Sequence, residues 1–196
     1  MKILLTGANG YIGKRLLPVL IEARHEVVCL VRDPRRFGVP ESLKDKVQVV
    51  KGDLLKPESL KDLPREIEAA YYLVHSMGSG SADFEEAEKA SASHFVSYLD
   101  TTGAKQVIYL SGIANDAHLS KHLSSRRHVE DLLAQGKARL TVLRAAIIIG
   151  SGSASFEIIR DLVEKLPVMV TPRWLNSRCQ PIAIRDVMFY LTAVLG

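Results

Sequence analysis

The sequence contains few of the features that mark secreted, membrane or metal-binding proteins. Among 196 residues there are two cysteines, Cys29 and Cys179, too few for a disulfide framework or a cysteine zinc site. No apolar run approaches the roughly 20 residues that a membrane-spanning helix needs. The apolar run after Met1 meets glycine too early for a signal peptide. We therefore expect a cytoplasmic protein without a metal site and without membrane insertion.

An excess of one charge is also missing. Lys and Arg number 26 against 22 Asp and Glu, which leaves a formal net charge of +4. Surfaces that bind nucleic acids usually combine basic residues with aromatic ones. The paired arginines of this chain have no aromatic residues between them. We expect no nucleic-acid partner, and we expect a small-molecule substrate whose identity the sequence does not reveal.

What the sequence does contain is a regular alternation of two patterns. Six short apolar runs, typical of strands buried on both faces, occupy residues 2–6, 26–31, 47–51, 69–74, 106–111 and 140–145. Between and after them, helical patterns occupy residues 11–23, 82–101, 119–135, 154–166 and 184–195, with a short helix near Ser59. This alternation predicts an α/β fold, a doubly wound parallel sheet of the Rossmann type in a single domain, with strand order 3-2-1-4-5-6.

Two places disturb this regularity. Pro18 falls inside the first predicted helix, where we expect a local distortion. From Pro167 to Pro181 no periodic pattern is visible. We divide the chain into a nucleotide-binding domain over residues 1–166 and a second part over residues 167–196, an irregular segment and a helix that begin a substrate-binding region. Such a chain is either a complete small protein or the front portion of a longer one.

A glycine-rich turn follows the first predicted strand and opens the first predicted helix. In a strand–turn–helix unit the first glycine permits the tight turn and the second lets a pyrophosphate approach the backbone. The third allows close packing. Free N–H groups at the helix start then bind the phosphates. No Gly-Lys-Ser/Thr follows, which excludes a P-loop. The predicted cofactor-binding residues of the turn are Gly7, Asn9, Gly10, Tyr11, Ile12 and Gly13.

The end of the second predicted strand bears on the choice of cofactor. NAD sites usually have an acidic residue there, which binds the ribose 2′-hydroxyl. In this chain Val31 holds that position and Arg32 follows it, and a guanidinium can bind a 2′-phosphate through two N–H donors. Asp33 either accepts from a ribose hydroxyl or caps a helical turn at Pro34. We expect NADP(H) as the preferred cofactor, with NAD(H) possible.

A third candidate position follows the third predicted strand. Asp53 and Leu54 lie at the carboxyl edge of the predicted sheet, near the place where a dinucleotide fold holds adenine. Asp53 can also cap the turn that leads to Pro57, and the two roles are compatible. We predict that both residues bind the cofactor.

These segments together resemble the atypical short-chain dehydrogenase/reductase superfamily, in particular its NmrA-like and epimerase/dehydratase-like branch. The matching segments span nearly the whole chain: 6–13, 31–33, 52–54, 107–112, 143–150 and 181–187. The resemblance implies a nicotinamide cofactor and a substrate site above the carboxyl ends of the strands. It also implies that Val74, His75 and Ser76 lie along the cofactor, and that Ala145 lies in the stretch beside the nicotinamide.

The resemblance breaks at the catalytic residues. Active members carry a serine at the end of the fifth strand and a Tyr-x-x-x-Lys pair on the following helix. Ser111 matches the serine, whereas His122 stands at the tyrosine position and Arg126 at the lysine position. A histidine is suited to proton transfer near neutral pH, and an arginine can hold a ribose hydroxyl but cannot give up a proton. Alternatively, both are solvated residues of an amphipathic helix.

Two functions therefore remain open from the sequence. The first is an NADP(H)-dependent oxidoreductase or nucleotide-sugar-epimerase-like enzyme, in which Ser111 orients the reacting oxygen and His122 donates the proton. The second is a catalytically silent NADP(H)-binding module, a redox sensor or assembly subunit with a protein partner. The missing tyrosine and lysine favour the second, and the intact glycine turn fits both.

Overall fold

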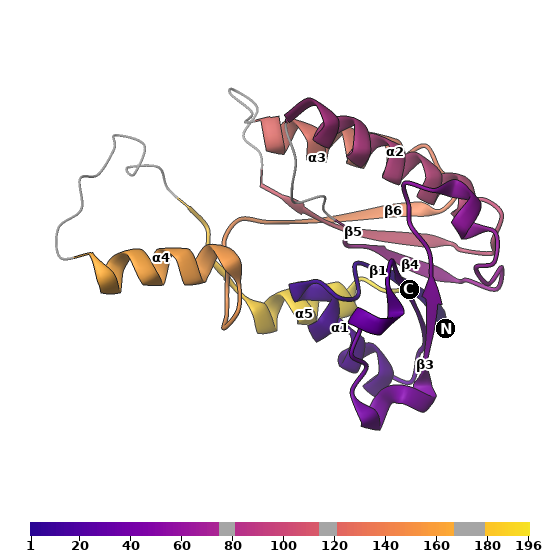
Figure 1. Cartoon of the computed structure of the whole chain (residues 1–196), viewed down its shortest axis with the longest axis horizontal. Helices are drawn as coiled ribbons and strands as arrows, with labels where there is room; N and C mark the ends of the chain where they lie inside the picture. The colour runs from indigo at the N-terminus through magenta and orange to yellow at the C-terminus, as the bar shows by residue number, and fades with distance from the viewer. Residues whose placement is uncertain (75–80, 114–120, 167–178) are drawn as a thin grey trace.

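The computed structural model describes residues 1–74, 81–113, 121–166 and 179–196; of residues 81–84 and 121–123 it describes only the backbone. Six parallel strands form one sheet in the order β3-β2-β1-β4-β5-β6, which confirms the predicted fold and strand order. The strands are β1 (Lys2–Thr6), β2 (Glu26–Val31), β3 (Val47–Lys51), β4 (Ala69–Tyr72), β5 (Gln106–Gly112) and β6 (Arg139–Ala145). Figure 1 shows the sheet with helices above and below it.

Both faces of the sheet are apolar, because consecutive strand residues are apolar and point to opposite sides. In β1, Ile3 and Leu5 belong to the core on one face, whereas Leu4 belongs to the core on the other. Cys29 of β2 lies in the first core and is fully buried, and burial raises the pKa of its thiol to about 12. A thiol with so high a pKa is unreactive.

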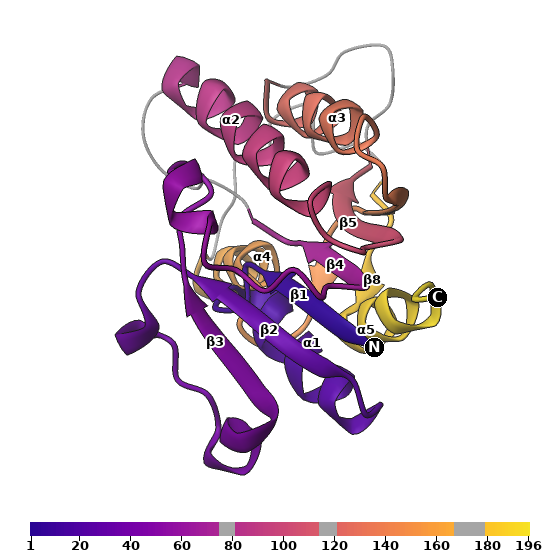
Figure 2. The same cartoon turned by 90° about the vertical axis from the view of Figure 1, so that its right-hand side faces the viewer.

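Four helices cover the two faces, as the two views in Figures 1 and 2 show. On one face α1 (Tyr11–Glu22) and α5 (Ile184–Ala193) pack against the sheet, and on the other face α2 (Ser81–Leu99) and α3 (Lys121–Leu133) do. The Tyr71 hydroxyl donates to the carbonyl oxygen of Leu191 at 2.7 Å, which fixes α5 to the middle of the sheet.

The remaining elements lie beyond β6. A two-stranded parallel ribbon pairs β7 (Ile148–Ile149) with β8 (Ile182–Ala183). Helix α4 (Ala154–Lys165) extends away from the sheet and has no buried residue. None of the described helices has the length and apolar character needed to cross a membrane.

Two local features depend on more than the apolar pattern of the sequence. Helix α1 continues through Pro18, as the predicted helix requires. The carbonyl that loses its partner there belongs to Lys14, which is exposed and can bond to water instead. Strand β4 ends at Tyr72, two residues earlier than expected. Its shortening has a physical cause, since the Leu73 N–H bonds to the Thr6 side chain at 3.3 Å rather than to a strand carbonyl.

Candidate cofactor site

The glycine turn between β1 and α1 needs glycine at two of its three positions for the protein's own geometry. Gly7 has a φ of +68°, and a Cβ there would lie 2.4 Å from the Leu73 carbonyl oxygen. A Cβ at Gly13 would lie 2.3 Å from the Gly7 carbonyl oxygen. At Gly10 the nearest atom is the same oxygen at 3.1 Å. The protein therefore tolerates a side chain best at Gly10, where a bound pyrophosphate would need the space.

Helix α1 begins with its first N–H groups unused by side chains. Gly10 is the N-cap residue, and no side chain among the described residues caps the helix. The Thr6 hydroxyl donates to the Tyr71 carbonyl oxygen at 2.9 Å, which ties the turn to β4. Uncapped N–H groups and the helix dipole attract anions, and the turn is held in place to receive one.

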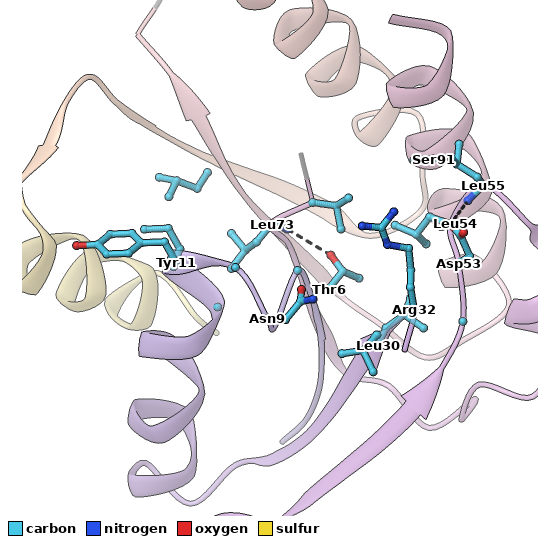
Figure 3. Close-up of a pocket in the computed structure, with 18 of the residues that line it drawn as sticks. Thr6, Asn9, Tyr11, Leu30, Arg32, Asp53, Leu54, Leu55, Leu73 and Ser91 are labelled. Carbon is cyan, nitrogen blue, oxygen red and sulfur yellow. Dashed lines mark hydrogen bonds between the residues drawn. The ribbon is translucent and has the colours of Figure 1, made fainter. Parts of the chain in front are cut away.

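Tyr11 contributes to the site in two directions. It lines the cavity at the start of α1, but its ring points away from Thr6 and Asn9 (Figure 3). The guanidinium of Arg15 lies 3.9 Å from the ring centroid and donates to the Ser151 carbonyl oxygen at 2.6 Å. These contacts fix the start of α1 against the loop that follows β7.

A cavity of about 470 Å³ lies above the glycine turn at the carboxyl ends of β1, β2 and β4. Its volume is in the range of small-molecule and cofactor sites. Ten of the predicted cofactor-binding residues line it, namely Gly7, Asn9, Gly10, Tyr11, Ile12, Gly13, Arg32, Asp53, Leu54 and Val74. Figure 3 shows the part of this lining around Thr6, Asn9, Arg32 and Leu54.

Arg32 and Asp33, adjacent in the sequence, have different surroundings. Arg32 reaches from the end of β2 toward Asp53 and Leu54 (Figure 3), and no hydrogen bond or ion pair with another described residue engages its side chain. Asp33 accepts hydrogen bonds from the Arg35 backbone and guanidinium at 3.1 Å and lies 3.8 Å from Arg36. These contacts, chiefly the hydrogen bond from Arg35, hold the pKa of Asp33 below its ordinary value. Asp33 is the cap of the turn at Pro34.

Asp53 also caps a turn, as predicted, but with only one carboxylate oxygen. Its Oδ1 accepts from the Leu55 N–H at 3.0 Å, and its own N–H donates to the Ser59 hydroxyl at 2.8 Å. Oδ2 has no hydrogen-bond partner among the described residues. One carboxylate oxygen therefore remains for a ligand donor in the cavity.

The candidate catalytic residues are found on α3 and on β5 beneath it. Ser111 is 3% exposed on β5 and does not line the cavity. Its hydroxyl makes no hydrogen bond of ordinary geometry with a described residue, yet it lies close enough to Glu130 to help lower the pKa of that carboxyl. Arg144 of β6 bonds Glu130 of α3 through two nitrogens, with Nε 3.3 Å from Oε1. We call Ser111, Arg126, Glu130 and Arg144 the α3 cluster.

Arg126 is assigned to the α3 cluster because its charge, like Ser111 and Glu130, acts on the pKa of Tyr109 of β5. Burial raises the pKa of Tyr109 to about 12, against the effect of the Arg126 charge. The Arg126 Nε is buried and has no partner among the described residues. His122 lies in the first turn of α3, but its side chain is outside the described residues, as are His75 and Ser76. Ala145 ends β6 and does not line the cavity.

The sequence-based reasoning missed the contribution of α2 to the cavity. Ala87 and Ser91 lie one turn apart on this helix, and both line the cavity. Alanine and serine occur throughout α2, so the sequence carried no distinct signal for these two positions. Leu30, Gly52, Leu73 and Leu110 also line the cavity, because they end or follow strands whose carboxyl ends meet there.

Comparison with known proteins decides the family. The model of the family described as NAD(P)H-binding matches residues 7–158. This chain belongs to that NAD(P)H-binding family. It lies within the atypical short-chain dehydrogenase/reductase superfamily, as the sequence resemblance indicates, and it binds a pyridine nucleotide.

Relatives and solved structures agree with this assignment. Photosystem II assembly factor Ycf39 of Synechocystis sp. is 26% identical over 149 residues, which cover 74% of this chain and 44% of the relative. UDP-glucose 4-epimerase of Thermotoga maritima has a TM-score of 0.76 at 17% identity, covering 100% of this chain and 73% of that one. UDP-glucuronic acid 4-epimerase of Bacillus cereus, solved with NAD, has a TM-score of 0.74 at 20% identity, covering 98% and 72%.

The chain spans less than half the length of the curated relatives it matches. It covers 44% of Ycf39 and 24% of the Saccharomyces cerevisiae protein YLL056C, to which it is 36% identical over 73 residues. Those of the solved structures that were compared are at most 21% identical to this chain. Their likeness therefore concerns the fold alone.

Proposed function

We propose that this domain binds NADP(H) in preference to NAD(H). The observation that carries the proposal is the contrast between Arg32 and Asp33. Arg32 lines the cavity and its guanidinium is not engaged by a described residue, whereas the Asp33 carboxylate is held by Arg35 and Arg36. Val31, at the position where NAD sites carry an acidic residue, is apolar and 3% exposed.

The physical reason for the preference is charge. A 2′-phosphate carries up to two negative charges, and a guanidinium binds it through two parallel N–H donors. A ribose 2′-hydroxyl without phosphate gains from a carboxylate acceptor, which the intramolecular contacts of Asp33 remove. The remaining residues fit the rest of the dinucleotide: the start of α1 suits the pyrophosphate, and Asp53 Oδ2 can accept from the adenine amino group.

Titration of the full chain with NADP⁺ and NAD⁺ tests this proposal, with Arg32→Ala as the variant and Arg185→Ala as the matched control. Arg185 is exposed and outside the cavity lining, and its replacement removes the same charge. Loss of a charged hydrogen bond, worth about 1.5–3 kcal/mol, is expected to weaken NADP⁺ roughly 10- to 100-fold in Arg32→Ala. NAD⁺ binding is expected to change less than about twofold. Equal losses for the two cofactors, or in the two variants, would contradict the preference.

For the chemistry, we propose an oxidoreductase or epimerase-like reaction on a small molecule with a hydroxyl or carbonyl carbon. A bound nicotinamide supplies or accepts the hydride. Ser111 is the candidate that orients the reacting oxygen, Arg126 the candidate that stabilises negative charge, and His122 the candidate proton donor. This assignment rests on the superfamily's residue spacing, with His122 and Arg126 standing for tyrosine and lysine.

Turnover measurements test the catalytic assignment. NADPH oxidation is measured over a panel of carbonyl compounds and nucleotide sugars, with His122→Ala beside the parent chain. His128→Ala is the control on the same helix, because His128 lies 3.1 Å from Glu85 on the α2 side. His122→Ala is expected to abolish turnover while cofactor affinity stays unchanged. Turnover that persists in His122→Ala removes the assignment.

A catalytically silent NADP(H)-binding module is the second candidate function. It is favoured by the positions of Ser111, which lies on β5 beneath α3, and of Arg126 on α3, because neither residue lines the cavity. The relative named as an assembly factor is compatible with it. This candidate predicts no turnover on any panel compound and a set of bound proteins that changes between NADPH and NADP⁺ in a pull-down.

A further inference from the structure

One side-chain hydrogen bond joins two walls of the cavity. The first wall is the loop 52–55, which we call the adenine loop because it carries Asp53. The second wall is the face of α2 that carries Ala87 and Ser91. His94 of α2 and the Leu54 carbonyl oxygen lie 2.7 Å apart at Nδ1, a distance typical of a strong hydrogen bond. A carbonyl only accepts, so Nδ1 carries the proton and donates.

Besides the His94 bond, the Gly52 N–H donates to the Val31 carbonyl oxygen at 3.0 Å, which joins the start of the adenine loop to β2, and the other bonds of the loop go to residues near it in sequence. Asp53 accepts from Leu55, and Ser59 bonds both the N–H and the carbonyl oxygen of Asp53. These bonds fix the shape of the loop but not its distance from α2. Leu54 is 6% exposed and packs in the core shared with α2, and apolar contact alone is non-directional. The His94 bond adds the direction.

The positions on α2 make this bond relevant to the cavity. Ala87, Ser91 and His94 are spaced by four and three residues, so they lie along one face of the helix. Ala87 and Ser91 line the cavity, whereas His94 does not. Figure 3 shows Ser91 close to Leu54 and Leu55. His94 therefore acts one turn behind the lining, on the backbone of a residue that belongs to it.

We propose that His94 is a positioning residue for the adenine end of the cofactor: its bond to Leu54 fixes the adenine loop against α2 and so sets the width of this half of the cavity. The inference rests on the proposed function, because it requires that a dinucleotide occupy the cavity. His94 does not touch the cofactor. Its effect on affinity passes through Leu54 and the neighbouring Asp53.

The test compares three variants of the full chain. His94→Phe keeps an aromatic ring and removes the donor, and His94→Asn places an amide N–H near the position of Nδ1. Tyr98→Phe is the matched control on the same helix, because the Tyr98 hydroxyl donates to the Pro64 carbonyl oxygen at 2.6 Å, outside the cavity lining. Should His94→Phe lower the yield of folded protein, His94→Leu provides a smaller variant without a donor.

Two ligands are titrated: NADP⁺ and adenosine 2′,5′-bisphosphate, which contains only the adenine end. Loss of one net hydrogen bond of about 1 kcal/mol corresponds to roughly a fivefold change in dissociation constant. His94→Phe is expected to weaken both ligands by this same factor, and His94→Asn to stay within about twofold of the parent chain. Tyr98→Phe is expected to bind like the parent chain.

The outcomes separate this inference from the proposed function. If the parent chain binds NADP⁺ and His94→Phe binds it equally well, His94 has no positioning role. If Tyr98→Phe loses as much affinity as His94→Phe, or if His94→Asn fails to restore it, the effect is one of general stability and the inference is wrong. If the parent chain binds neither NADP⁺ nor the bisphosphate, the proposed function fails with it.

Discussion

The glycine-turn cavity and the α3 cluster lie at the same edge of the sheet, yet their polar groups are used differently. In the cavity, the N–H groups at the start of α1, the Arg32 guanidinium and Asp53 Oδ2 are not used by described neighbours. In the α3 cluster, Glu130 and Arg144 bond each other. The first region has hydrogen-bonding capacity left at the border of the cavity. In the second, the Glu130–Arg144 pair joins α3 to the sheet, and the Ser111 hydroxyl and Arg126 Nε, unpartnered among the described residues, lie outside the cavity lining.

The two regions differ in whether their polar groups stabilise the fold or can bind a ligand. Buried polar groups that satisfy each other stabilise the fold, whereas unsatisfied groups that border a cavity are free to act on a ligand. The cavity meets the second condition around the start of α1, Arg32 and Asp53. Substitutions in the two regions should therefore differ in whether they change ligand binding, stability or both.

Gly13→Ala should damage the fold and the site together. Its Cβ would lie 2.3 Å from the Gly7 carbonyl oxygen and 2.7 Å from the Ala8 Cα, both backbone atoms that cannot move aside. Overpacking of this kind costs about 3 kcal/mol, and NADP⁺ binding should be lost. Urea unfolding and cofactor titration measure the two effects. A variant that unfolds like the parent chain would show that the turn adjusts.

Gly10→Ala should separate binding from stability. Its Cβ would meet only the Gly7 carbonyl oxygen, at 3.1 Å, so the free energy of unfolding should change by less than about 1 kcal/mol. The same Cβ would occupy the approach to the N-terminus of α1, and loss of charge-assisted contacts there corresponds to roughly a 10- to 100-fold weaker NADP⁺ affinity. Unchanged affinity would mean that the phosphates do not approach the backbone here.

Glu130→Gln should reveal a pH-dependent contribution to stability. Burial raises the pKa of Glu130, but the hydrogen bond from Arg144, with a smaller contribution from the nearby Ser111 hydroxyl, outweighs it, so the pKa lies below the ordinary value of 4.5. A carboxyl with a lowered pKa stabilises the fold above its unfolded pKa, and that stability is lost as pH falls through the folded pKa. At pH 7 the variant should be less stable by about 1–2 kcal/mol.

Urea unfolding at several pH values checks the prediction for Glu130. The difference between variant and parent chain should shrink below pH 4.5. Glu85→Gln is the control, because the Glu85–Lys89 pair is exposed and should contribute little to stability. A difference for Glu130→Gln that does not depend on pH would contradict its role as a paired carboxylate.

Ser111→Ala should have the smallest effect. The hydroxyl makes no hydrogen bond of ordinary geometry with a described residue and does not line the cavity. Stability should change by less than about 1 kcal/mol, and the NADP⁺ dissociation constant by less than about twofold. Thermal unfolding and titration measure both. A loss of affinity of about tenfold or more would place Ser111 at the cofactor after all.

Much of the fold could be predicted because local sequence patterns determine it. The bounds of β1, β2 and β3 match the apolar runs of the sequence, since each strand must be apolar on both faces. The end of β4 could not be predicted, because it depends on the Thr6 hydroxyl, which lies 67 residues away from Leu73 along the chain.

The site divides in the same way. Gly7, Gly10 and Gly13 follow from one local motif, and Arg32 and Asp53 follow from their places at strand ends. Whether Arg32 or Asp33 is available to a ligand depends on Arg35, whose side chain could equally have pointed to solvent.

The sequence by itself determined the order of strands, the glycine turn and the presence of a basic residue after β2. The turn and the basic residue are local sequence features, and the strand order follows from the alternation of strands and helices along the chain. Only the tertiary structure decided that α2 lines the cavity, that His94 bonds Leu54, and that Ser111 lies beneath α3. These contacts join segments that lie far apart along the chain, as with His94 and Leu54, 40 residues apart, and their geometry arises when both helical layers pack on the twisted sheet.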